Sequence, residues 1–241
     1  MMNPYSRTEF LLGKTAMEKL KNARVAVFGL GGVGGYAVEA LARSGVGHLV
    51  LVDHDTVSLT NLNRQILATR ATVGMKKAIA AKERVQSIDP SIEVEAMDTF
   101  FLPETAHLFD FGSYDYVIDA IDTVTGKLSL VEQAKAAGTP IICAMGAGNK
   151  LDATAFQVAD IYETTVCPLA RIMRKECRKR GIKSLKVVYS QEEPICCTLP
   201  PDDPAWAELP EGRNALPGSC AFVPSVMGLI IAGEVIKDLV K

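Results

Sequence analysis

Four glycines near the start of the chain have the positions of a nucleotide-binding turn. Gly29, Gly31, Gly32 and Gly34 follow the apolar run "ARVAVF" and open a segment of helical composition. Glycines there allow a tight turn, and the free N–H groups of a helix N-terminus favour phosphate. Asp53 ends the next apolar run, where a carboxylate can accept hydrogen bonds from both ribose hydroxyls. The spacing therefore predicts a nucleotide site.

The residues after Asp53 indicate which nucleotide binds. "DHDTVSLTNLNRQ" follows, and then "GMKK". A nicotinamide site needs little beyond the ribose carboxylate, whereas an adenylating enzyme must neutralise a triphosphate with cations and amides. The pattern favours ATP. Two alternatives are an NAD-dependent oxidoreductase and a non-catalytic, nucleotide-gated RNA-binding protein. Tight binding of NAD without binding of ATP would support the first, and a complete lack of AMP release would support the second.

Apolar runs alternate with segments of helical composition through most of the chain. We expect strands at 23–30, 48–53, 92–98, 114–120, 140–146, 155–161 and 185–190, and helices at 6–22, 31–45, 74–89, 124–138, 167–181 and 221–240. The alternation predicts an α/β fold: a Rossmann-like, doubly wound, mainly parallel sheet with a C-terminal extension. We expect a single domain over 1–241, with a nucleotide-binding core at 1–165. The extension, 166–241, would bind substrate, carry a mobile proline-rich loop at 191–219 and end in a helix.

A basic segment interrupts a chain whose formal net charge is -2. Residues 171–186 hold eight cations and one anion, a net charge of +7. Helical spacing places Arg171, Arg174, Lys175 and Arg178 near one another, as a surface for nucleic-acid phosphates requires. A basic helix face that is simply solvated is the alternative.

The sequence shows no signal peptide, and its longest apolar run, near "AFVPSVMGLIIAG", is short and contains Pro224. We therefore expect a cytoplasmic protein with no membrane partner. The six cysteines include no CxxC pair, so we predict no structural zinc and no disulfide. We expect them to pack as small hydrophobes. Cys167, Cys196 and Cys197 stay open as alternatives for a mobile or activated nucleophile.

"GLGGVG", "DHDTVSLTNLNRQ", "GMKKA" and "DAIDT" occur in an order that resembles the ubiquitin-activating-enzyme superfamily, which includes the bacterial activators of molybdopterin and thiamine sulfur carriers. The likeness covers about residues 5–165. "CPLARIMRKECRKRGI", "VVYS" and "GSCAFVPSVMGLIIAGEVI" resemble the tRNA threonylcarbamoyladenosine dehydratases in particular. The resemblance implies ATP-dependent closure of the threonylcarbamoyl side chain of an adenosine next to the anticodon, through an acyl-adenylate. An activator of a ubiquitin-like sulfur carrier protein is the alternative, although this chain lacks the paired CxxC ligands of many such activators.

The resemblance also implies a role for each residue of the motifs. ATP would be bound by Gly29, Gly31, Gly32, Gly34, Asp53, Asp55, Asn61, Arg64 and Lys77. The catalytic set would be Arg7, Arg64, Lys77 and Asp122. Asp122 would bind Mg²⁺, whereas Asp119 would be structural. Arg7 would reach the γ-phosphate from the partner subunit of a homodimer. The tRNA that carries threonylcarbamoyladenosine would dock on Arg171, Arg174, Lys175, Arg178, Lys179 and Arg180. A sulfur-transfer or redox partner stays open.

Overall fold

A computed structural model of the chain describes residues 2–196 and 218–241. Its centre is one seven-stranded sheet with the order β3-β2-β1-β4-β5-β7-β6. The strands are β1 (Arg24–Phe28), β2 (His48–Val52), β3 (Glu93–Met97), β4 (Tyr116–Asp119), β5 (Ile141–Ala144), β6 (Phe156–Asp160) and β7 (Lys186–Ser190). All neighbours pair in parallel except β6 and β7, so the prediction of a doubly wound, mainly parallel sheet is confirmed.

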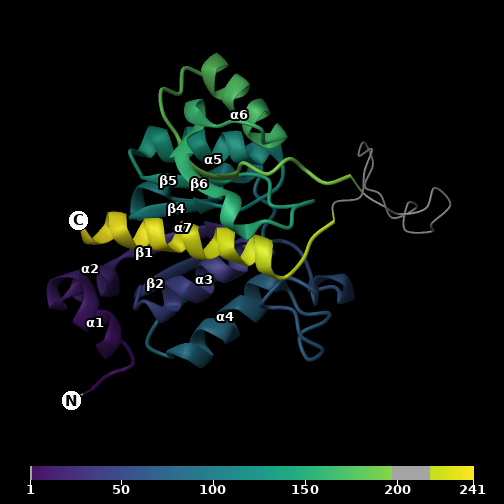
Figure 1. The fold of residues 1–241 in the computed structure, drawn as a ribbon. Helices are drawn as coiled ribbons and strands as arrows, with labels where there is room; N and C mark the ends of the chain where they lie inside the picture. Colours follow the sequence, from purple (N-terminus) through teal and green to yellow (C-terminus); the bar gives the residue numbers. More distant parts are fainter. Residues whose placement is uncertain (1, 197–217) are drawn as a thin grey trace.

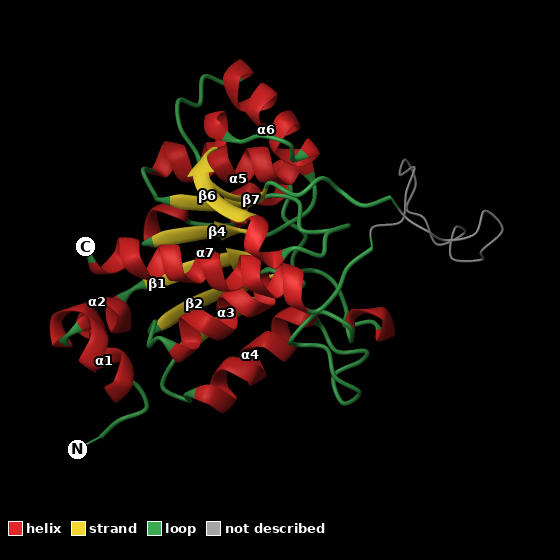
Figure 2. Ribbon diagram, in the orientation of Figure 1, coloured by secondary structure: helices red, strands yellow, loops and turns green. Residues whose placement is uncertain are grey.

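Helices cover both faces of the sheet (Figures 1 and 2). The helices are α1 (Ser6–Leu12), α2 (Lys14–Asn22), α3 (Gly34–Arg43), α4 (Lys77–Ile88), α5 (Val124–Ala137), α6 (Pro168–Lys179) and α7 (Phe222–Val240). On one face α3 lies between α4 and α7, and α5 and α6 lie on the other. Each βα unit thereby places a strand end next to a helix start at one edge of the sheet.

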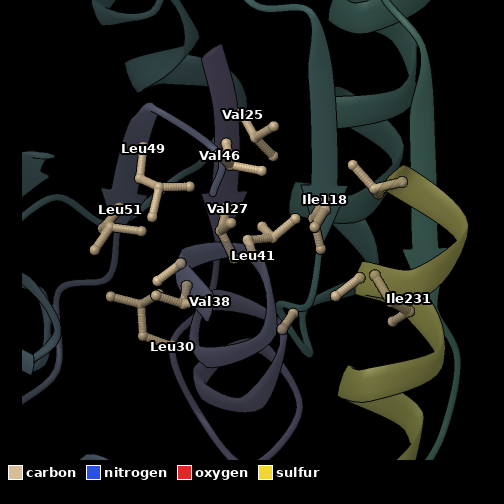
Figure 3. Packing of buried hydrophobic residues seen from close by; sticks show 14 of the residues in the cluster. Val25, Val27, Leu30, Val38, Leu41, Val46, Leu49, Leu51, Ile118 and Ile231 are labelled. Atoms are coloured by element: carbon tan, nitrogen blue, oxygen red, sulfur yellow. The ribbon is translucent and has the colours of Figure 1, made fainter. Parts of the chain in front are cut away.

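Successive residues of β1 belong to two different cores because side chains alternate across a strand. Val27 belongs to the same core as Leu41 of α3 and Ile231 of α7, and Figure 3 shows Val27 close to Leu41, with Ile231 farther off on α7. Phe28 faces the opposite way, where α5 and α6 supply residues such as Met173. The sequence of a strand that is buried on both faces is a nearly continuous apolar run, and "ARVAVF" therefore predicted a buried strand.

One element differs from the sequence-based expectation. The single helix predicted over 6–22 is two helices, because Gly13 between them has φ 85° and cannot continue the α1 backbone. Within the sheet, β7 from the predicted extension 166–241 lies between β5 and β6, both of which come from the first 165 residues.

Residues 197–217, the centre of the predicted loop at 191–219, lie outside the described residues. No helix of the described part is long and apolar enough to cross a bilayer.

Candidate nucleotide-binding and adenylation site

A cavity of about 360 Å³ opens at the carboxyl ends of β1, β2 and β4. This is the switch point of the sheet, since the chain runs from β1 outward to β2 and β3 and then returns to β4 on the other side of β1. Its walls include Gly29, Gly31, Gly32, Asp53, Asp55, Asn61, Arg64, Lys77 and Asp122. The structure therefore brings together nine of the residues singled out in the sequence.

The glycine turn owes its shape to close packing against the strand beside it. Gly29 has φ 87°, and a Cβ there would lie 2.6 Å from the carbonyl oxygen of Ala120 after β4. A Cβ at Gly34 would lie 1.8 Å from the carbonyl oxygen of Gly29. Gly34 does not itself line the cavity: it lets α3 start directly behind the turn, so that the helix N-terminus faces the cavity.

Asp53 connects the glycine turn to the end of β2. Its side chain is buried, and its Oδ2 accepts a hydrogen bond of 2.7 Å from the Leu30 N–H. Its Oδ1 accepts one of 2.8 Å from the Asp55 N–H. Each carboxylate oxygen keeps a second acceptor position, and the residue lines the cavity. Asp53 can therefore fix the turn and bind two hydroxyl groups of a ligand.

Lys77, the first residue of α4, is a buried cation whose ammonium lies 2.6 Å from Asp55 Oδ2. Partial burial alone would raise the pKa of Asp55. The hydrogen bond and charge of Lys77 outweigh that effect and hold the pKa of Asp55 below its usual value. The pair holds the ammonium in position at the cavity wall.

Arg64 has hydrogen bonds but no counter-charge among residues 2–196 and 218–241. Its Nη1 donates to the Thr60 carbonyl oxygen and to Asn63 Oδ1, both at 2.9 Å. Partial burial lowers the pKa of Arg64, which means that the guanidinium is desolvated without an anion to compensate. Asn61, also in the wall, accepts a 3.1 Å bond from the Ser58 N–H and keeps its amide N–H groups for donation. Both side chains suit a bound anion.

A buried ion pair lies behind the part of the cavity wall that follows β4. The Lys127 ammonium of α5 is 3.0 Å from both carboxylate oxygens of Asp119 and donates a 2.9 Å bond to the Ile121 carbonyl oxygen. Neither side chain is exposed to solvent. The pair fixes residues 120–122 between β4 and α5, and Asp122 stands exposed at the cavity edge. Asp119 pairs with Lys127 and is not among the residues that line the cavity.

Sequence reasoning missed several wall residues. Gln65 is buried in the wall, and its Oε1 has no partner among the described residues. It belongs to the quoted "NLNRQ", but nothing in its residue type separated it from a core glutamine. Phe28, Phe100 and Phe101 form an apolar side of the cavity. The pair "FF" shortly after β3 was the available signal, because it follows a strand that ends at this edge.

Arg7 is exposed on α1 and does not line the cavity of its own chain. Figure 1 shows α1 beside the amino ends of the strands, whereas the cavity is at their carboxyl ends. The structure therefore leaves this arginine available to another molecule.

The basic segment on α6 is partly neutralised within the chain. Lys179 and Arg180 both pair with Glu176, at 2.6 and 2.7 Å. Arg174 is half-buried and donates to Thr164, with 2.8 Å to Oγ1. Arg178 stacks over the Tyr162 ring at 5.3 Å. Arg171 and Lys175 are exposed and make no such contact within the described part of the chain.

The cysteines divide by burial. Cys143, Cys167 and Cys177 are buried, and burial raises the pKa of the Cys143 thiol well above its usual value. Cys196 is exposed, and Cys197 lies outside the described residues.

Comparison with known proteins connects these features to a family. Residues 5–241 match the model of the ThiF family. The chain is 46% identical over 245 residues to a tRNA threonylcarbamoyladenosine dehydratase of Bacillus subtilis, covering 100% of this chain and 96% of that protein. It is similar to the Escherichia coli tRNA N6-threonylcarbamoyladenosine dehydratase TcdA solved in complex with ATP, with a TM-score of 0.85, 32% identity, and coverage of 98% and 93%. A sulfur carrier protein adenylyltransferase of Thermus thermophilus is 30% identical, covering 95% of this chain and 73% of that protein.

Proposed function

Since this chain belongs to the ThiF family, we propose that it is an ATP-dependent tRNA threonylcarbamoyladenosine dehydratase. It converts the threonylcarbamoyl side chain of a modified adenosine into a ring by way of an acyl-adenylate. The observation that carries the proposal is the cavity wall itself, in which the glycine turn, Lys77 and a half-buried Arg64 guanidinium without a described counter-charge lie together. Such a site is built for a polyphosphate, and a relative of 32% identity is named as an ATP complex.

ATP fits the cavity in one orientation. Asp53 accepts hydrogen bonds from the ribose hydroxyls, and the apolar side formed by Phe28, Phe100 and Phe101 covers the base. The α-phosphate lies at the glycine turn, where the N-terminus of α3 contributes positive potential. Arg64 and Lys77 neutralise the phosphates, and Asn61 donates to them.

Two further groups complete the site. Asp122 offers a carboxylate at the cavity edge, which suits Mg²⁺ because that ion takes one or two carboxylates together with phosphate oxygens and water. The ion would supply neutralisation of phosphate charge. Arg7 comes from the partner subunit of a homodimer and contacts the γ-phosphate; its exposure on α1, away from its own cavity, supports this assignment.

The chemistry has two steps. A carboxylate oxygen of the substrate attacks the α-phosphorus, the bond from the α-phosphorus to the bridging oxygen breaks, and pyrophosphate leaves. The carbamoyl group then attacks the acyl carbon of the mixed anhydride, loses a proton and expels AMP, which carries away the former carboxylate oxygen. Because this nucleophile is already tethered to the electrophile, ring closure has the advantage of an intramolecular reaction. No cysteine nucleophile is required.

The tRNA brings the substrate to the cavity and contacts the basic face of α6. Arg171, Lys175 and Arg178 are exposed there without a described carboxylate partner, and Arg171 and Lys175 also lack the ring contact that Arg178 makes, so these two are the strongest candidates for phosphate contacts. Arg174, Arg178, Lys179 and Arg180 complete this face. Because the proposed substrate is a tRNA, we propose that the protein acts in the cytoplasm.

The decisive experiment is mass spectrometry of nucleosides from tRNA that carries threonylcarbamoyladenosine, after incubation with the protein and Mg²⁺–ATP. We expect the modified nucleoside to lose one water while AMP and pyrophosphate form. Asp122→Ala is the matched control. Pyrophosphate exchange that responds to a sulfur carrier tail and not to this tRNA would instead assign the chain to the sulfur carrier adenylyltransferases.

A further inference from the structure

Asn63, the residue before Arg64, links the wall of the nucleotide cavity to the chain that enters α7. Its Oδ1 accepts a hydrogen bond of 2.9 Å from Arg64 Nη1. Its Nδ2 donates one of 3.0 Å to the carbonyl oxygen of Ser219, which is 156 residues further along the chain. In Figure 1 the chain that leads into α7 passes beside the loop between β2 and α4, to which Asn63 belongs. Asn63 does not itself line the cavity, so its side chain acts on the cavity through Arg64.

The two partners fix the orientation of the Asn63 amide. A guanidinium only donates hydrogen bonds, and a carbonyl oxygen only accepts them. Turning the amide by half a rotation would place its NH₂ group against Arg64 and its oxygen against the oxygen of Ser219, and both bonds would be lost. The Asn63 oxygen is therefore committed to Arg64 as long as Ser219 keeps its place.

Ser219 has a fixed position because the chain is attached on both sides of it. The Asn149 N–H donates a 2.8 Å bond to the Gly218 carbonyl oxygen, and Asn149 Oδ1 accepts one of 2.5 Å from the Gly218 N–H. Asn149 has φ 58°, a left-handed conformation that asparagine adopts more readily than most residues. After Ser219 the chain enters α7, where Pro224 lies 3.2 Å from a Cβ built on Gly32 of the cavity wall.

The bonds to Nη1 leave one edge of the Arg64 guanidinium unused. Nη1 carries two hydrogens, and it donates both, to Asn63 and to the Thr60 carbonyl oxygen, at 2.9 Å each. The N–H groups of Nε and Nη2 have no hydrogen-bond partner among residues 2–196 and 218–241. Nε and Nη2 form the fork that binds two oxygens of a phosphate at once. A guanidinium that is held at Nη1 presents this fork in one direction.

We propose that Asn63 is a positioning residue for ATP, which holds Nη1 of Arg64 so that the Nε–Nη2 fork faces the phosphates. Without Asn63 the guanidinium keeps a single bond, to Thr60, and turns about it. A mobile arginine side chain loses more conformational entropy when it binds a ligand than one that is already held. The role of Asn63 rests on the proposed function only in that the ligand of Arg64 is a nucleotide phosphate.

The test is a double-mutant cycle on the binding of Mg²⁺–ATP to the full chain, measured by isothermal titration calorimetry. Arg64→Ala should raise the Kd of ATP by roughly 10- to 100-fold, because it removes hydrogen bonds between charged groups. Asn63→Ala should raise it by roughly 2- to 10-fold, the cost of ordering one long side chain. The double variant should bind ATP as Arg64→Ala does, since Asn63 has no effect without the guanidinium that it holds.

Two variants and one ligand serve as controls. Asn63→Gln keeps both an acceptor and a donor, and it should recover part of the affinity that Asn63→Ala loses. Asn22→Ala changes an exposed asparagine of α2 that makes no side-chain hydrogen bond within the described chain, and it should bind ATP as the wild type does. Adenosine has no phosphate, so its Kd should be the same for the wild type and for Asn63→Ala.

An Asn63→Ala variant that binds ATP as tightly as Asn22→Ala would overturn this role. Additive losses in the double variant, an Asn63→Gln variant no tighter than Asn63→Ala, or weaker adenosine binding by Asn63→Ala would overturn it too, because each indicates a general loosening of the loop. A wild type that binds no ATP would overturn both this role and the proposed function. A wild type that binds ATP and follows the cycle, but leaves the tRNA unchanged, keeps the role of Asn63 and loses the tRNA activity.

Discussion

Replacing Lys127 with methionine should destabilise the protein far more than its single charge suggests. The ammonium makes three contacts of 2.9–3.0 Å, to both oxygens of Asp119 and to the Ile121 carbonyl oxygen, and both charged side chains are fully buried. Methionine fills a similar volume but leaves the Asp119 carboxylate without a counter-charge. Breaking one half of a buried pair costs about 3–5 kcal/mol of unfolding free energy.

Urea unfolding followed by circular dichroism at neutral pH measures this cost. The control is Lys179→Met, because Lys179 pairs with Glu176 at 2.6 Å while 58% of its side chain is exposed; its loss should cost less than about 1 kcal/mol. Adding Asp119→Asn to Lys127→Met should recover part of the stability. Equal losses for the two lysine variants would refute the argument that burial decides the strength of these pairs.

Three other predictions follow from the site and the surface. Asp122→Ala and Arg7→Ala should each abolish turnover. An equal mixture of the two variants should regain about one quarter of wild-type activity, because half of the random dimers contain one intact site out of two. A mixture that stays inactive would place Arg7 outside the site. Partial burial raises the pKa of Asp238, but hydrogen bonds from lysine and tyrosine side chains outweigh this effect and lower that pKa to about 2. Its stabilising effect is therefore complete above the unfolded pKa of about 4 and is lost as the pH falls through the folded value, so the difference in Tm between wild type and Asp238→Asn should vanish near pH 2. Arg171→Gln with Lys175→Gln should weaken tRNA binding and reduce the salt slope of log K by roughly 1.5, and unchanged binding would put the tRNA on another face.

The sequence predicted the parts of the fold that depend on local periodicity. Buried parallel strands such as β1 are continuous apolar runs, and the motif residues follow strands that end at one edge of the sheet. It could not predict the break at Gly13, because a glycine inside a helical pattern is often tolerated, nor that β7 lies between β5 and β6, which depends on pairing between distant segments.

Within the site, residue type and motif distinguished only some of the functional side chains from the structural ones. Asp53 and Lys77 were identified from the motifs, and both line the cavity. Lys127 looked like an ordinary helical lysine, since its burial depends on where α5 crosses the end of β4. Spacing placed Arg174 on the basic face of α6, but the chain before that helix folds back so that Thr164 accepts hydrogen bonds from it. The roles of Lys127 and Arg174 thus depend on tertiary contacts, which the local sequence does not reveal.

The position of β7 has a consequence for how the chain is made. A ribosome synthesises β6 before β7, yet β6 has no strand to pair with until β7 has entered the sheet beside β5. The growing chain therefore holds an unpaired strand while the next 25 residues are translated, and an incomplete sheet edge is prone to aggregation during that interval. A gene fragment that stops at codon 165 would leave β6 without its partner strand, so we expect residues 1–165 to be less stable alone than within the full chain.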